Sequence, residues 1–279
     1  MNKSMPRTGS SVASARPSLT QGMIQKNSNM ANNAPLMDQT RHASVPRERP
    51  ILFNGAMVRA VLAGDKTQTR RTNGLEYFSR PENDPDGWSC ARVADGMAYM
   101  VYRNMPHERP VRCPYGQPGD RLWVREAFRF AASLDRLSPN DVGEKALDAG
   151  YNTPWAPTQF EADGTRTGAW RGFDTPPAIT APGKLRPGIH MPRWACRLAL
   201  DIVRVRVERL QAINHFDALA EGVGLNPSAA DVPMTVPAGE SLPRAMFGAL
   251  WEQINGAAAW AANPWVWVVE FRRAGGEEV

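Results

Sequence analysis

The segment from 195 to 207 constrains the fold most, because its alternation of apolar and polar residues is the longest in the chain. Every second residue from Leu198 to Ile202 is apolar, as in a strand with one buried face. The alternation slips at Ile202-Val203 and resumes at Val205, which predicts a β-bulge. Because bulged, strongly bent strands suit a small barrel, we expect this strand to belong to one.

Two shorter segments also have strand patterns. Residues 121–126 follow a Pro-Gly-Asp turn at 118–120, and residues 265–271 alternate between two faces. Three helices are predicted by helical spacing together with start and stop signals. The bounding residues are Asn54 and Gly64 for the first helix, Asn214 (with Asp217 as a capping box) and Gly222 for the second, and Ser241 and Asn255-Gly256 for the third. The fold class is therefore α+β.

Three stretches rich in Pro, Gly and Asp interrupt these elements. They cover roughly 79–118, 133–187 and 225–240, and their composition predicts long loop insertions, with a hairpin around Gly96 to Tyr102. The ordered domain is expected to span 49–274, followed by a short tail at 275–279.

Residues 1–48 have the composition of a disordered, basic N-terminal arm. They are rich in Ser, Asn, Gln, Pro, Arg and Met and have almost no aromatic or β-branched residues, so they bury too little surface to offset the entropy of ordering. Residues 1–50 contain seven Lys or Arg and two acidic residues, which accounts for the formal net charge of +5. The body is neutral, which argues against a wide duplex-binding face; a small ligand site and an arm that touches nucleic acid both remain open.

The cysteines and the hydropathy exclude several classes of protein. Cys90, Cys113 and Cys196 are widely spaced and form no CxxC, so neither a disulfide scaffold nor a zinc site is expected, and no metal or cofactor is predicted. Cys113 is expected to be buried or in a turn. There is no run of about 18 apolar residues and no signal-peptide h-region, so we expect a soluble cytoplasmic protein without a membrane partner.

The order of four motifs resembles a known family. The first helix is followed by Gly64 and a Lys-Thr-x-Thr-Arg motif, a Pro-Gly-Asp turn leads into Trp-Val-Arg-Glu, a strand feeds a helix that carries Ala-x-x-Glu-Gly, and a strand closes the chain. The residues are Lys66, Thr67, Thr69 and Arg70; Trp123 to Glu126; and Ala218, Glu221 and Gly222. This order resembles the ASCH domain, a PUA-like β-barrel.

The resemblance is closer still to phage-encoded ASCH-like proteins, which are often labelled phage morphogenetic proteins. It rests on the stretches 116–126, 189–195 and 263–267, and it covers about residues 50–273. The resemblance implies a small PUA-like barrel with flanking short helices and long loop insertions.

Small bacterial ASCH proteins include an amidohydrolase that removes the acetyl group from N4-acetylcytidine. Carried over by motif, its catalytic residues become Lys66, Thr69 and Glu221. The chemistry is consistent: a desolvated lysine can lose its proton, a threonine hydroxyl needs such a base, and a carboxylate can pass a proton to a leaving amine. Glu221 in the last helical turn also has the wrong sign for the helix dipole, which favours a functional role. A solvated loop is the alternative for Lys66 and Thr69.

Eight further residues are candidate substrate-binding residues. Arg70 and Arg71 either bind phosphate or pair with Asp65 and Glu76. Strand alternation puts Trp123 and Arg125 on one face and Glu126 on the other, with a core position for Trp123 weighed above base stacking. A structural imidazole is the alternative for His190. The full set is Thr67, Arg70, Arg71, Trp123, Arg125, Glu126, His190 and Arg193.

Three functions follow from these observations. The first is an amidohydrolase acting on a modified pyrimidine nucleoside. The second is a non-catalytic RNA- or nucleic-acid-binding module whose partner is single-stranded RNA or a modified base. The third is a phage assembly factor. Fold alone does not choose among them, and the oligomeric state stays open.

Overall fold

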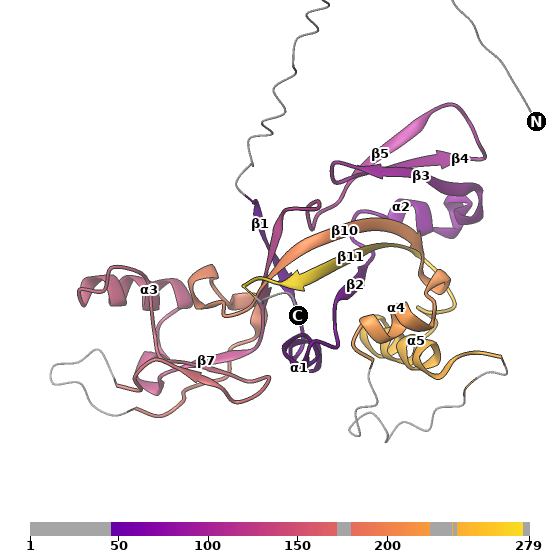
Figure 1. Cartoon of the computed structure of the whole chain (residues 1–279). Coiled ribbons are helices and arrows are strands. Elements are labelled where there is room, and N and C mark those ends of the chain that lie inside the picture. Colours follow the sequence, from indigo (N-terminus) through magenta and orange to yellow (C-terminus); the bar gives the residue numbers. More distant parts are fainter. Residues whose placement is uncertain (1–45, 172–179, 224–235, 237–238, 276–279) are drawn as a thin grey trace, which may run out of the picture. The chain divides into compact units, whose positions relative to one another are not determined.

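A five-stranded sheet organises the fold, in a computed structural model that describes residues 46–171, 180–223, 236 and 239–275. Its strand order is β1-β6-β10-β11-β2 (Figure 1). Only β1 and β6 run parallel, and the other neighbours are antiparallel. The strands are β1 (Glu48–Leu52), β2 (Gln68–Arg71), β6 (Arg121–Arg125), β10 (Ala199–Arg209) and β11 (Trp265–Arg273). With the helices that flank it, this sheet makes the fold α+β.

The predicted bulge lies in β10, the longest strand. Its pairing with β11 shifts register between Ile202 and Arg204, so Val203 is the extra residue. The prediction of a bulge at this slip is confirmed. The strand starts later than predicted, at Ala199, because Arg193–Ala195 form a 3₁₀ turn instead.

The expected barrel is not closed. β1 and β2 are the two edge strands of the sheet, and no backbone pairing joins them within the described residues. A side chain bridges the two edges instead, because Arg71 on β2 donates through Nη2 to the carbonyl of Leu52 on β1 at 3.3 Å. The gap between the edge strands is where the candidate site lies.

The three predicted helices are present with the predicted ends. In α1 (Gly55–Ala63), the Asn54 side chain accepts from the backbone N–H of Met57, and Gly64 ends the helix at φ +87°. A residue in the left-handed conformation at this position lets a backbone N–H donate to the last carbonyls of the helix. Asn214 caps α4 (His215–Ala220), with Gly222 two residues beyond its end, and α5 (Leu242–Asn255) ends at Gly256.

Two of the predicted loop insertions contain regular structure. The stretch 79–118 holds a sheet of β3 (Trp88–Ala94), β4 (Met97–Tyr102) and β5 (Glu108–Arg112), which confirms the hairpin at Gly96. The stretch 133–187 holds α3 (Pro139–Asp148), and its β8 (Thr158–Phe160) and β9 (Arg166–Thr167) form a sheet with β7 (Phe128–Phe130). The loop predictions were wrong there because Gly, Pro and Asp mark tight turns and caps: Asp95-Gly96 turns the hairpin, and Ser138 with Asp141 forms a capping box.

The boundaries of the domain also differ slightly from the prediction. β1 starts at Glu48, so regular structure begins within the segment predicted as an arm. The rest of that arm up to residue 45, most of 225–240 and the end of the tail from 276 lie outside the described residues. A four-residue helix, α2 (Glu76–Ser79), precedes the β3-β4-β5 sheet. No helix among the described residues has both the length and the apolar character needed to cross a bilayer.

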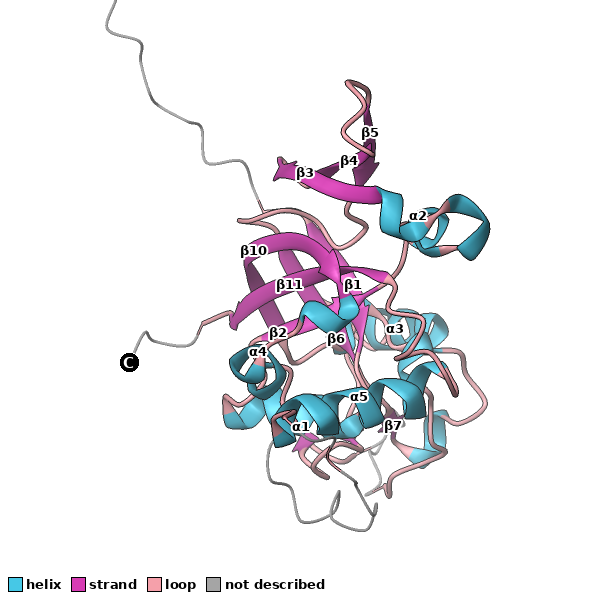
Figure 2. Cartoon of the chain, turned by 90° about the vertical axis from the view of Figure 1, so that its right-hand side faces the viewer, coloured by secondary structure: helices cyan, strands magenta, loops and turns pink. Residues whose placement is uncertain are grey.

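Strand β11 is buried on both faces. Trp267, Val269 and Phe271 belong to the main hydrophobic cluster, whereas Val266 and Val268 belong to a second cluster with α4 and α5. Figure 2 shows α4 and α5 together beside the sheet. Because α4 and α5 cover this face of the sheet, α5 lies opposite β2. Helix α5 therefore forms one wall of the site.

Candidate functional site

Backbone contacts bring Lys66 and Glu221 together from positions 155 residues apart. The chain turns after α1, where the N–H groups of Asp65 and Lys66 both donate to the carbonyl of Ala60. Lys66 and Glu221 then form an isolated antiparallel β-bridge, and the N–H of Thr67 donates to the carbonyl of Ala220 at 2.9 Å. The end of α4 is therefore held against the turn that leads into β2.

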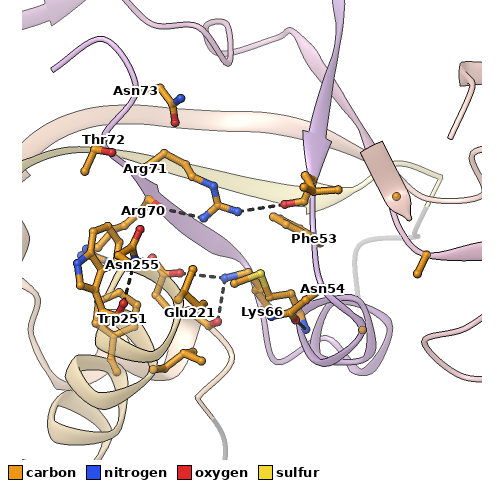
Figure 3. A pocket seen from close by; sticks show the side chains of 18 of the residues that line it. Phe53, Asn54, Lys66, Arg70, Arg71, Thr72, Asn73, Glu221, Trp251 and Asn255 are labelled. Carbon is orange, nitrogen blue, oxygen red and sulfur yellow. Dashed lines mark hydrogen bonds and ion pairs between the residues drawn. The ribbon is translucent and has the colours of Figure 1, made fainter. Parts of the chain in front are cut away.

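The Lys66 amine is buried and makes three hydrogen bonds. Nζ donates to the carbonyl of Gln68 at 2.8 Å. It also donates to the carbonyl of Glu221 at 2.8 Å and to Glu221 Oε2 at 2.9 Å (Figure 3). The two residues are only 2% and 5% exposed. Since an ammonium has three donors, each Lys66 N–H has an acceptor.

Burial lowers the pKa of Lys66 below its ordinary value of 10.5, since desolvation penalises the charged amine. The charge of Glu221 and its hydrogen bond oppose this shift, and the nearby Arg71 and Arg70 add to it. The amine therefore gives up its proton more readily than a solvated lysine does.

Arg70 joins the same carboxylate to a wider network of ion pairs. Its Nη1 lies 3.0 Å from Glu221 Oε1, and its Nη2 lies 2.6 Å from Glu208 Oε1 and 3.1 Å from Asp217 Oδ2. Arg206 also pairs with Glu208 and Asp217. Arg70 therefore pairs with acidic residues, as one of its two interpretations held, but its partners are not Asp65 or Glu76.

A cavity of about 610 Å³ opens beside this network. Its walls come from the end of β1, the start of α1, β2 and α5, and its charged lining consists of Lys66, Arg70, Arg71 and Glu221 (Figure 3). Aromatic rings complete the walls, and the ring of Phe53 lies 5.6 Å from Lys66 Nζ and 5.7 Å from the Arg71 guanidinium. The aromatic lining residues are Phe53, Phe247 and Trp251.

Thr69 is fully buried and does not line the cavity. Its hydroxyl accepts a hydrogen bond of 2.6 Å from Arg71 Nη1. The predicted catalytic trio is therefore assembled in two parts: Lys66 and Glu221 touch directly, whereas Thr69 contacts Arg71.

The predicted residues on β6 lie outside the cavity lining. Trp123 and Arg125 share a face as predicted, with the guanidinium 5.5 Å from the indole ring. Trp123 is partly buried and belongs to none of the hydrophobic clusters, so the expected core position is wrong. Its position on the outer face of β6 leaves it partly exposed.

Glu126 is 1% exposed, and each oxygen of its carboxylate accepts a hydrogen bond of 2.9 Å from Arg197. Arg193 is exposed and pairs with Glu48, while His190 and Thr67 are also exposed. None of these four predicted residues lines the cavity. The short 3₁₀ turns at 188–190 and 193–195 place His190 and Arg193 on the surface.

Three residues in or beside the site, Asp217, Trp251 and Asn255, were not among the predicted site residues. Asp217 stands one turn before Glu221 on the same helix, so the i, i+4 spacing was a usable signal. Trp251 and Asn255 have the same spacing on α5, but their place in the cavity depends on how α5 packs.

The described residues contain no group of three or more His, Cys, Asp or Glu side chains suited to a metal ion. Cys113 is buried as predicted, and burial raises the pKa of its thiol to about 11. Comparisons of the chain with models of protein families, with curated proteins and with solved structures find no match.

Proposed function

We propose that this chain binds a nucleobase-like ligand in the cavity and hydrolyses an exocyclic amide of a modified cytidine such as N4-acetylcytidine. The observation that carries the proposal is the 2.9 Å contact between Lys66 Nζ and Glu221 Oε2 in the wall of a cavity of about 610 Å³. That volume falls in the range of roughly 300–1,000 Å³ typical of small-molecule sites.

The burial of this pair supports a functional role. Removing two charges from water is costly, and apolar side chains of similar size stabilise a fold at least as well. A buried amine and carboxylate beside a cavity place a proton donor and a proton acceptor next to a bound ligand.

The proposed reaction uses Glu221 as the proton acceptor. Each of its oxygens engages one cation, which leaves a lone pair on each for a water molecule. The water loses a proton to Glu221 as its oxygen attacks the acyl carbon, and the positive charges of Lys66 and Arg70 in the cavity wall stabilise the resulting oxyanion. The carbon–nitrogen bond then breaks, the proton passes from Glu221 to the exocyclic nitrogen, and cytidine and acetate leave. Thr69 is not a reacting group in this scheme, and its hydroxyl accepts a hydrogen bond from Arg71.

The proposal extends to the fold. The bulged sheet β1-β6-β10-β11-β2 with its flanking helices supports a PUA-like, ASCH-type barrel that is open at the seam between β1 and β2. The opening at this seam gives a ligand a route to the cavity, since Leu52, Phe53 and Arg71 from its two sides line the walls.

The test incubates the purified chain with N4-acetylcytidine and follows cytidine and acetate by chromatography. We expect turnover by the wild-type protein and its loss in Glu221→Gln. The matched control is Glu144→Gln, which makes the same change at an exposed position of α3. Absence of turnover by the folded wild-type protein contradicts hydrolysis, and tight binding without turnover leaves the non-catalytic nucleic-acid-binding alternative.

A further inference from the structure

The cations that line the cavity differ in their partners. Lys66 and Arg70 share the carboxylate of Glu221, and Arg70 also pairs with Glu208 and Asp217. Arg71 has no carboxylate within ion-pair distance in the described part of the chain. Its charge is therefore the one in this wall that a protein anion does not neutralise by direct contact.

The contacts of Arg71 are all with neutral oxygens. Nη1 donates to Thr69 Oγ1 at 2.6 Å and to the carbonyl of Arg70 at 2.8 Å, and Nη2 donates to the carbonyl of Leu52 at 3.3 Å. Five N–H groups belong to a guanidinium, so these three hydrogen bonds orient Arg71 and leave donors unused. Because Arg71 is half-buried and lines the cavity, an anion there would be poorly screened by solvent and strongly bound.

Another wall of the cavity is formed by the side chain of Trp251. Trp251 on α5 is 7% exposed, and its indole N–H is buried without a hydrogen-bond partner in the described residues. The nitrogen is enclosed, as are the unpartnered indole nitrogens of Trp170 and Trp265, so Trp251 offers the cavity its ring and not a donor. Figure 3 shows Trp251 on the α5 side of the cavity and Arg71 on the β2 side.

We propose that the cavity takes a pyrimidine nucleotide rather than a bare nucleoside, with its phosphate on Arg71 and its ring on Trp251. The guanidinium fork matches the oxygens of a phosphate, and the aromatic wall contacts the ring face. The identity of the base rests on the proposed function, whereas the anion subsite rests on Arg71.

The experiment measures, by calorimetry on the full chain, the affinities for cytidine 5′-monophosphate and for cytidine. Since a charge-assisted pair changes affinity about tenfold or more, we expect the nucleotide to bind at least about tenfold more tightly. Arg71→Gln should bring the nucleotide to the affinity of cytidine and leave cytidine unchanged. Arg71→Lys, which keeps the charge but not the fork, should retain part of the preference.

Two further variants separate the subsites. Trp251→Leu keeps an apolar side chain but removes the aromatic ring, so both ligands should weaken by the same factor. Arg112→Gln removes an equal charge from an exposed position of β5 and should change neither affinity. Thermal unfolding of each variant shows whether it is folded, and Arg71→Lys supplies the comparison if Arg71→Gln is not.

Three results overturn the proposal: equal affinities for the two ligands, a preference that survives Arg71→Gln, or binding of a cytidine-containing RNA with no binding of the mononucleotide. The outcome is distinguishable from failure of the proposed function. An Arg71-dependent preference for the nucleotide without hydrolysis of N4-acetylcytidine supports the anion subsite and contradicts the reaction.

Discussion

Glu221 and Glu126 are two buried carboxylates with similar local chemistry and different surroundings. They are 5% and 1% exposed, and each contacts arginine nitrogens at 2.9 to 3.0 Å. Glu126 gives both oxygens to the fork of Arg197, which also pairs with Asp163 at 2.9 Å. Glu221 instead divides its oxygens between Lys66 and Arg70.

The two carboxylates differ in what lies beside their oxygens. The Glu126–Arg197 pair is capped by the ring of Phe160, 4.1 Å from the guanidinium, and it lines no part of the cavity. Glu221 lies in the cavity wall beside Lys66. Burial and pairing are common to both residues, so contact with the cavity is what separates a candidate catalytic group from a structural one.

The largest expected effect concerns hydrolysis. Glu221→Gln should lower kcat for N4-acetylcytidine by about 10²- to 10⁴-fold, because general acid–base groups contribute that much. Glu126→Gln should leave kcat of the folded molecules within about twofold, since its carboxylate does not reach the ligand. Rates are measured on protein whose folded fraction is known from circular dichroism. A loss of kcat equal in both variants would remove the distinction between the two carboxylates.

The second-largest effect is expected on the free energy of unfolding when Glu126 is replaced. Glu126→Ala leaves the Arg197 guanidinium without its main partner, and breaking a buried ion pair in this way costs about 3–5 kcal/mol. The double variant Glu126→Leu with Arg197→Met should recover most of the loss, because an apolar pair replaces both charges. Urea denaturation measures each value. A loss below about 1 kcal/mol would mean that this pair resembles an ordinary surface ion pair.

An alkaline pH dependence should mark the Lys66 cluster. The folded-state pKa of Lys66 is lowered by burial, so between that pKa and 10.5 the unfolded chain holds more protons than the folded one. The stability of the wild-type protein relative to Lys66→Met should therefore rise with pH in this window and be constant below it. Raised thiol and phenol pKa values, at Cys113 and Tyr115, are common to both proteins and cancel in the difference. A flat or falling difference contradicts the direction of the shift.

The smallest effect is expected at acidic pH. It concerns Asp163, which shares Arg197 with Glu126. The hydrogen bond from Arg197 lowers the pKa of Asp163 from 3.8 to about 2. Its contribution to stability is thus present above about pH 4 and is lost as the pH falls toward 2. Asp163→Asn should abolish this part of the acid dependence, with a modest amplitude because the residue is exposed. If the wild-type protein and Asp163→Asn lose stability identically as the pH falls, the Asp163–Arg197 pair is not formed in solution.

Local signals determined much of the secondary structure from the sequence. The cap at Asn54, the stop at Gly64 and the slip at Val203 depend on backbone geometry within a few residues, so each appears where it was predicted. Signals of the same kind gave a wrong prediction of loops in the stretches 79–118 and 133–187, where strands are present. A glycine or a proline marks a turn without showing whether strands or loops flank it.

For the site, the motif order determined only part of what the structure contains. Lys66 and Glu221 were paired by resemblance and do touch, and alternation put Trp123 and Arg125 on one face. Tertiary structure alone decided that Glu126 meets Arg197, that Thr69 meets Arg71, and that α5 brings Trp251 to the cavity. The reason is physical: helix ends and strand faces follow from neighbours in the chain, whereas the partner of a charge depends on which distant elements pack beside it.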